Sequence, residues 1–201
     1  MTPYEHIEFE LEQKKISQEK ADNWHLPLFK TQNRTLLKCL DSMEDFKLCQ
    51  EDVPLIIKLA ENPKYDIGLF AGYVDLFSHD CIHILLGRGL LVKDEAFVIG
   101  YTMGSSRKMF RWRRNLFMFI CKYLYPEGYK FGEEERYVFN SAVLLGSKCG
   151  VDLSKVKFET FLNRKLSTAR RELEINIEDI EKFYSFEKQI FPNSRESQRL
   201  L

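Results

Sequence analysis

Two histidines and two carboxylates with the spacing of a metal site occur in the middle of the chain. They are His79, Asp80, His83 and Glu95. Imidazoles at positions i and i+4 of a helix can reach one ion, because each residue advances about 100° around the helix axis. Imidazole and carboxylate donors together suit zinc, manganese or iron better than calcium or magnesium. The pattern therefore predicts a divalent metal site for zinc, manganese or iron.

The surrounding sequence indicates how these side chains are brought together. Residues 66–86 are mostly apolar and lack turn signals, which favours a buried helix over a strand. Gly87 and Gly89 are predicted to end that helix and reverse the chain, since glycine readily takes the left-handed conformation found after helix ends. Glu95 would begin the next helix and face the histidines. Asp75, one turn before the first histidine, is expected to lie beside the ligands without binding the metal.

Two other interpretations of this pattern stay open. A hydrogen-bonded network could satisfy the buried groups without a metal, although burying so many ionisable groups is costly and a divalent cation would supply a counter-charge. Adjacent histidine and aspartate also occur in His-Asp metal-dependent phosphohydrolases. That class needs an earlier histidine and a later aspartate as further ligands, for which His25 and either Asp152 or Asp179 are available. This interpretation leaves His83 and Glu95 without a role.

The apolar spacing along the chain predicts an all-α fold. We expect a single-domain helical bundle of about seven to nine helices over residues 1–201. Residues 1–25 are charged with sparse apolar positions, which suits a peripheral helix. Residues 192–201 are polar and follow a proline, so we expect a flexible tail.

Helix boundaries follow from prolines, glycines and capping residues. Besides the helix that ends at residue 86, the expected helices cover residues 34–49, 54–62, 93–106, 107–125, 133–145, 155–166 and 168–190. The helix that carries Glu95 is expected to kink or divide at Gly100 and at the triplet Gly104-Ser105-Ser106, because glycine is a poor helix former. The last helix is expected to break near Asn176.

Composition excludes several classes of protein. Among 201 residues, Lys+Arg and Asp+Glu number 30 each, so there is no overall charge to attract nucleic acid. The five cysteines form no Cys-x-x-Cys pair, which argues against a zinc ribbon or a disulfide framework and favours buried, reduced thiols. The first residues resemble neither a signal peptide nor a transit peptide, and the longest apolar runs fall far short of the roughly 20 residues of a membrane span. We therefore expect a cytoplasmic protein.

A basic and aromatic segment, residues 107–125, follows the candidate metal site. Such a mixture is typical of a surface helix that lies on anionic lipid head groups at the inner face of a membrane. The residues expected to contact lipid are Arg107, Arg111, Trp112, Arg113 and Phe117. An internal groove for an isoprenoid tail, lined by Phe117, Phe119 and Tyr123, is a second interpretation. A helix with a solvated first half and a buried second half would need no lipid at all.

The motif His79-Asp80-x-x-His83, followed by eleven residues and Glu95, resembles the signature of the coenzyme Q biosynthesis protein four family. The resemblance covers about residues 75–104. It implies an all-helical fold, these four residues as ligands of a divalent metal, commonly zinc, and a dimer or larger complex that makes ubiquinone at a membrane face. The implied step is oxidative decarboxylation at C1 of a prenylated quinone precursor.

Two features separate this chain from most members of that family. Asp94 stands before the glutamate, where glycine is common, and the eukaryotic members carry a mitochondrial presequence that is not found here, so a bacterial-type relative is expected. Two functions remain open from the sequence. One is an enzyme in which the metal acts as a Lewis acid on an isoprenoid quinone precursor. The other is a non-catalytic lipid-binding scaffold with a structural metal.

Overall fold

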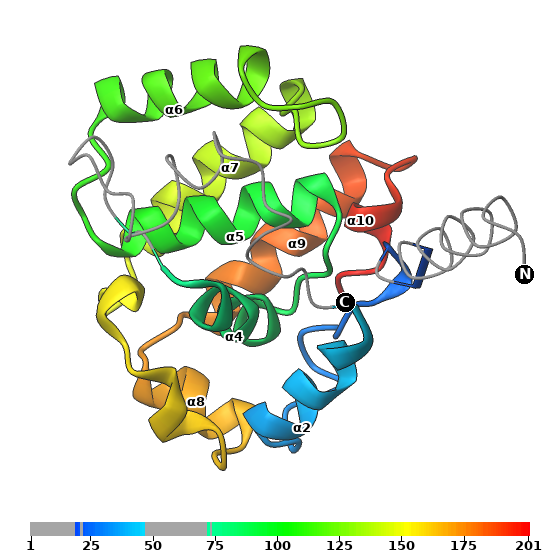
Figure 1. The fold of residues 1–201 in the computed structure, drawn as a ribbon, viewed down its shortest axis with the longest axis vertical. Coiled ribbons are helices and arrows are strands. Elements are labelled where there is room, and N and C mark those ends of the chain that lie inside the picture. The colour runs from blue at the N-terminus through cyan, green and yellow to red at the C-terminus, as the bar shows by residue number, and fades with distance from the viewer. Residues whose placement is uncertain (1–18, 21, 47–71, 73) are drawn as a thin grey trace, which may run out of the picture.

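A computed structural model describes residues 19–20, 22–46, 72 and 74–201 (Figure 1). Within these ranges the chain forms eight α-helices, which confirms the predicted all-α class. They are α2 (Leu36–Leu40), α4 (Leu76–Leu86), α5 (Val92–Ser105), α6 (Arg111–Tyr123), α7 (Glu133–Gly146), α8 (Leu166–Glu172), α9 (Ile177–Ile190) and α10 (Arg195–Gln198). The predicted helix at 54–62 and most of the predicted N-terminal helix lie outside the described residues.

Helices α5 and α7 pack with their backbones in contact. A Cβ atom on Gly104 would lie 2.3 Å from the Val143 carbonyl oxygen, and one on Gly146 would lie 2.1 Å from the Tyr101 carbonyl oxygen. Only glycine permits this approach, because any side chain would collide with the facing backbone. The predicted break at Gly100 is wrong, because α5 runs unbroken through this residue and its glycines serve the helix contact. The predicted division at Gly104-Ser105-Ser106 is confirmed, because α5 ends at Ser105.

Two clusters of buried apolar side chains meet at this helix pair. The larger cluster joins α5 and α7 to α2, α4, α8 and α9, and the smaller one joins them to α6. Figure 1 shows α6 as the outermost helix on one side of the fold, with α2 and α8 at the opposite end. Helix α4 is buried over its second half, which brings its side chains against the start of α5.

Side chains from α8 and α9 hold the end of α4. The buried Arg170 guanidinium donates to the Leu85 carbonyl at 2.7 Å, and the Tyr184 hydroxyl donates to the Leu86 carbonyl at 2.7 Å. These contacts satisfy carbonyl groups that have no partner within the helix. Gly87 then takes a left-handed conformation, with φ of 71°, and ends α4 as predicted. Contacts from α8 and α9 thus fix the position of the reversal between α4 and α5.

The helix predicted from residue 34 is shorter than its apolar spacing suggested, and the α-helix predicted over residues 155–166 is wrong. After α2 the chain tightens into a 3-10 helix, Asp41–Phe46, and between 155 and 166 it forms the 3-10 helix Phe158–Phe161. Phe158 is fully buried, so core packing outweighs the local preference for an α-helix here. Helices α8 and α9 are separate, as predicted, because the Asn176 side chain accepts a hydrogen bond from the Asp179 amide at 3.0 Å and starts α9.

The predicted flexible tail at 192–201 is wrong. Residues 195–198 form α10, and the Ser197 and Leu200 side chains are buried. The Leu200 carbonyl accepts a hydrogen bond from the Leu28 amide at 3.3 Å. The polar side chains of this segment contact residues that are distant in the sequence. The composition of the segment alone cannot predict such contacts.

Candidate metal centre

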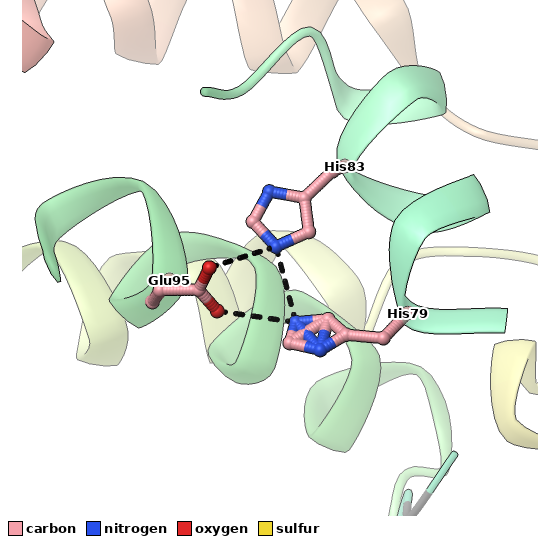
Figure 2. Close-up of side chains that lie close together, drawn as sticks. All are labelled: His79, His83 and Glu95. Carbon is pink, nitrogen blue, oxygen red and sulfur yellow. Dashed lines mark hydrogen bonds and ion pairs between the residues drawn. The ribbon is translucent and has the colours of Figure 1, made fainter. Parts of the chain in front are cut away.

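Three of the predicted ligands meet between α4 and the start of α5. Figure 2 shows both imidazole rings directed at the Glu95 carboxylate. The Nε2 atoms of His79 and His83 are 3.1 Å apart, and each lies 3.2 Å from one oxygen of Glu95. Donor atoms of a tetrahedral ion with bonds of about 2.0–2.1 Å would be about 3.3–3.4 Å apart, and neighbouring donors of an octahedral ion about 3.0 Å. The triangle has the size that a metal ion requires, and the same distances also allow direct hydrogen bonds among the three side chains.

The local sequence explains why the two histidines share one face. The Asp75 side chain accepts a hydrogen bond from the Ser78 amide at 2.8 Å and so starts α4 at Leu76. His79 and His83 then fall on successive turns, with ring centroids 4.7 Å apart. Asp75 therefore acts as a helix cap. Its charge still reaches His79, where it acts against the larger effect of burial on the pKa.

The orientation of His83 is set by the reversal after α4. Its Nδ1 atom lies 2.7 Å from the carbonyl oxygen of Gly89. A carbonyl oxygen can only accept, so Nδ1 carries the hydrogen. The other ring nitrogen, Nε2, faces His79 and Glu95. It donates to the Glu95 carboxylate when protonated, and it offers a lone pair to a metal once that proton is displaced. Metal-binding histidines are commonly held in this way by a hydrogen bond from the second nitrogen.

Burial and their mutual contacts shift the pKa values of His79, His83 and Glu95. Burial, followed by the nearby His83, lowers the pKa of His79 to about 4. Burial would lower the pKa of His83 as well, but the charge and hydrogen bond of Glu95 outweigh it and the net shift is upward. Burial would raise the pKa of Glu95, yet the two histidines hold it below its usual value. At neutral pH the site thus offers a carboxylate and a neutral His79 to a cation.

Asp80 is not among the three convergent residues. It follows His79 directly in α4, so its side chain leaves the helix about 100° away from that of the histidine. Its charge contributes to the raised pKa of His83, after that of Glu95. Direct metal binding by Asp80 stays a prediction.

Solvent reaches two of the three side chains. His79 and Glu95 are 19% and 29% exposed, whereas His83 is 2% exposed. Structural zinc sites usually have four protein ligands and are closed, while catalytic sites have three and keep a position for water or substrate. Two histidines, one carboxylate and partial exposure match the second arrangement. The donor set therefore fits a divalent metal with an open position.

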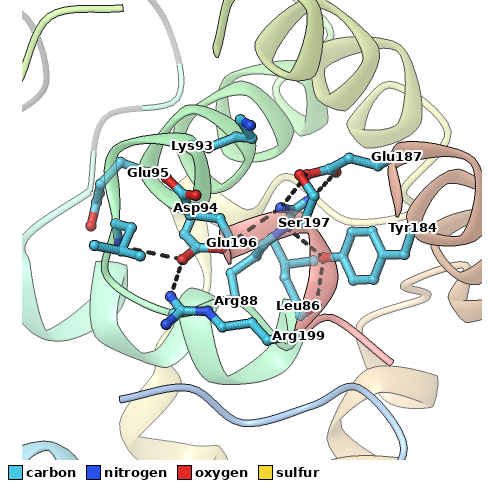
Figure 3. Close-up of polar contacts among 12 residues, drawn as sticks. Leu86, Arg88, Lys93, Asp94, Glu95, Tyr184, Glu187, Glu196, Ser197 and Arg199 are labelled. Atoms are coloured by element: carbon cyan, nitrogen blue, oxygen red, sulfur yellow. Dashed lines mark hydrogen bonds and ion pairs between the residues drawn. The ribbon is translucent and has the colours of Figure 1, made fainter. Parts of the chain in front are cut away.

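A buried charge network lies behind the site (Figure 3). Arg88, between the two glycines of the reversal, donates to both carboxylate oxygens of Glu187 at 3.0 and 2.5 Å. Its guanidinium carbon lies 4.1 Å from the ring centroid of Phe97 and 4.3 Å from that of Tyr184. Sequence reasoning missed this network, because its members are about 100 positions apart. The one available signal was a lone arginine in an otherwise apolar segment.

The further ligands of a His-Asp phosphohydrolase are engaged elsewhere. The Asp152 carboxylate accepts from Ser154 and pairs with Lys155 at 3.1 Å. Asp179 pairs with Lys148 at 2.9 Å. Neither these aspartates nor His25 belongs to the convergent group. The phosphohydrolase interpretation therefore loses the additional ligands it needs.

The helix predicted to contact lipid presents a different aromatic surface from the expected one. Phe117 is fully buried and stacks on Phe139, with ring centroids 5.1 Å apart, so its predicted contact with lipid is wrong. Trp112, Phe119 and Tyr123 are 54%, 54% and 59% exposed. The predicted internal groove is wrong as well, because its three lining residues divide between the core and the surface.

The cations near this helix have different roles. Arg107 precedes α6 and donates to the Cys149 carbonyl at 2.9 Å, so it links two parts of the fold. Arg111 is exposed at the first position of α6. The Arg113 guanidinium lies 5.2 Å from the Trp112 ring centroid, a cation–π contact at the surface. Arg111 and Arg113 therefore accompany the exposed aromatic side chains.

None of the described helices has both the length and the apolar character needed to cross a membrane. Comparisons with models of protein families, with curated proteins and with solved structures found no match to this chain. The assignment of a function consequently depends on the residues of the site and on their geometry.

Proposed function

We propose that this chain is a metal-dependent protein of isoprenoid-quinone synthesis that acts on a prenylated aromatic precursor at a membrane surface. The observation that carries the proposal is the triangle of donor atoms from His79, His83 and Glu95, 3.1 and 3.2 Å apart. The resemblance of their spacing to the coenzyme Q biosynthesis protein four family supplies the substrate class.

The residues of the chain would hold a divalent ion, with zinc expected, through two neutral imidazoles and one carboxylate. When bound, the ion would supply Lewis acidity toward a carboxylate or phenolate oxygen of the aromatic head group. The hydrogen bond to Gly89 directs Nε2 of His83 at the ion, which would displace the proton shared with Glu95, and Glu95 would provide the negative charge. The partial exposure of His79 and Glu95 would let a substrate approach the ion. Oxidative decarboxylation at C1 would break the bond between the ring and the carboxyl group and release carbon dioxide. A hydroxyl group with its oxygen from water would take its place, and two electrons and two protons would pass to an external two-electron oxidant.

The outer face of α6 supports a location at a lipid surface. Trp112, Phe119 and Tyr123 are spaced by seven and four residues, so they lie on one side of the helix. Helix α6 contains three arginines, one lysine and no acidic residue, in a chain with no net charge. Aromatic rings among cations suit the interface of an anionic bilayer. We propose this face as the membrane contact.

Metal analysis of protein purified without chelators tests the site. We expect close to one zinc or another divalent ion per chain in the native protein and its loss in Glu95→Gln. His25→Gln is the matched control, since His25 lies outside the convergent group and should keep its metal. Native protein that contains no stoichiometric metal, and takes up none when zinc is added, would exclude the proposed site.

Turnover separates an enzyme from a scaffold. If the metal is catalytic, folded Glu95→Gln should no longer convert a prenylated hydroxybenzoate precursor, as followed by liquid chromatography and mass spectrometry. If the metal is structural, the same variant should only unfold at a lower temperature. Equal conversion by the native protein and by the folded, metal-free variant would refute a catalytic role.

Fluorescence of Trp112 tests the membrane contact. The chain has two tryptophans, and Trp24 is 8% exposed with its indole N–H bonded to Ser42 at 3.2 Å. A blue shift on adding phosphatidylglycerol vesicles should therefore come from Trp112 and disappear in Trp112→Phe. Phe119→Ala should weaken flotation with the vesicles, whereas Phe186→Ala, which removes an exposed ring from α9, should not. Equal flotation of both variants would contradict the proposal.

A further inference from the structure

We infer that Arg199 is a positioning residue that sets the metal affinity of the site, although it binds no metal itself. Arg199 follows α10 and reaches back to the reversal between α4 and α5 (Figure 3). The inference rests on the metal site of the proposed function but not on its quinone substrate. Its basis is that one guanidinium touches the supports of two separate ligands.

The first support is Asp94, which precedes Glu95 in the first turn of α5. Arg199 Nη2 lies 2.5 Å from Oδ2 of the fully buried Asp94. The same Asp94 oxygen accepts a hydrogen bond from the Leu91 amide at 3.3 Å, where α5 begins. Arg88 lies 3.7 Å from the other oxygen. The first turn of α5, which carries Glu95, is therefore fixed through this carboxylate.

The second support is Gly89, whose carbonyl orients His83. A Cβ atom placed on Gly89 would lie 2.0 Å from Arg199 Nη2 and 2.7 Å from the Trp24 carbonyl oxygen. The guanidinium thus occupies the space that any side chain at Gly89 would need, and it packs directly on this residue. Because the Gly89 carbonyl accepts the hydrogen of His83 Nδ1 at 2.7 Å, the contact limits how far that carbonyl can move.

Arg199 is itself held from a third direction. Its Nη1 atom donates to the Asp22 carbonyl at 2.8 Å, and its side chain is only 10% exposed. A planar guanidinium with several fixed donors can satisfy Asp94 and Asp22 together, which the single ammonium of lysine cannot do with the same geometry. The arginine therefore ties the segment before α2 and the segment after α10 to the candidate metal ligands.

A small movement of Asp94 or Gly89 would change the distances between a bound metal and its ligands Glu95 and His83. Ligand distances in metal sites vary by only about 0.2 Å around their preferred values. Loss of residues that orient metal ligands typically weakens metal binding about 10–100-fold. A purely structural role for Arg199 would instead lower the unfolding temperature and leave the dissociation constant of the folded protein unchanged. Metal affinity therefore distinguishes the two roles.

The test compares the full-length native chain with Arg199→Gln, Arg199→Lys and Arg195→Gln. Arg195 is the matched control, because it also bonds to the segment before α2, at Asn23, but it contacts neither Asp94 nor Gly89. Zinc is titrated at 25 °C in competition with a chelating dye. We expect about 10–100-fold weaker binding for Arg199→Gln, an intermediate loss for Arg199→Lys and less than about threefold change for Arg195→Gln.

A second measurement does not need metal. Nitrogen NMR of the metal-free protein reports which ring nitrogen of His83 carries the hydrogen, and Arg199→Gln should lower the Nδ1–H fraction. Native affinity together with a native tautomer in folded Arg199→Gln would overturn the inference. If Arg199→Gln does not fold, the same two readouts on Arg199→Lys decide. Failure of the native chain to bind zinc would refute the metal site and, with it, the proposed effect on affinity.

Discussion

The buried Arg88–Glu187 pair allows a quantitative prediction for the substitution Glu187→Gln. Both side chains are fully inaccessible to solvent, and the carboxylate receives two hydrogen bonds from Arg88 and one from Ser197 at 2.9 Å. Glutamine has nearly the same shape but no charge. The substitution would therefore leave the Arg88 cation buried without its main counter-charge.

Removing one partner of a buried ion pair typically costs about 3–5 kcal/mol of unfolding free energy. Arg88 would keep the hydrogen bond to Tyr184 at 3.1 Å, the ring faces on both sides and the Asp94 carboxylate at 3.7 Å. These remaining contacts place the expected loss near the lower limit, at about 3 kcal/mol. For a domain of this size, about 2–4 °C per kcal/mol gives a decrease in Tm of about 6–12 °C.

Urea unfolding followed by circular dichroism measures the loss. The matched control is Glu133→Gln, since the Glu133 side chain is 72% exposed and its pair with Lys122 spans 3.3 Å. An exposed pair of this kind contributes at most about 1 kcal/mol. If Glu187→Gln loses no more free energy than this control, the reasoning about the buried pair is refuted.

Three further predictions concern packing, protons and thiols. Gly104→Ala should lower the Tm although alanine favours helices by about 1 kcal/mol, because its Cβ would meet Val143; a higher Tm would contradict the packing. Zinc binding must displace the proton of His83, whose pKa is raised. Zinc affinity, measured by dye competition, should therefore fall by up to about tenfold per pH unit as the pH decreases through this pKa. A pH-independent affinity would contradict this prediction. Four cysteine thiols are buried and should react with maleimide only after the protein unfolds, as followed by mass spectrometry. They are Cys39, Cys81, Cys121 and Cys149.

The sequence predicted that His79, His83 and Glu95 converge, because the determinants are local; Asp80, the fourth predicted ligand, is not in this group. Two histidines four positions apart must share a helix face, and a glycine reversal must bring the next helix back. The all-α class followed in the same way from apolar periodicity. The limits of the helices were less well predicted. The chain near Phe158 follows a 3-10 path, because the position of a fully buried ring is set by its neighbours in space.

Periodicity specifies the angle between side chains on a helix but not which face another element covers. The sequence therefore identified a basic aromatic helix, and only the tertiary structure turned Phe117 into the core and Trp112 and Phe119 outward. The same limit applied to Gly100, which permits a helix contact rather than a kink.

What the sequence by itself determined is that His79 and His83 share one helix face and that Glu95 returns to them, since helix geometry brings residues four positions apart together and a glycine reversal follows. What only the tertiary structure decided is how those donors are held. Arg199 and Glu187 lie about 100 residues from the reversal they support, and their contacts exist only once the chain has folded. A pattern of spacing contains no information about such partners, because their proximity results from packing of the whole domain.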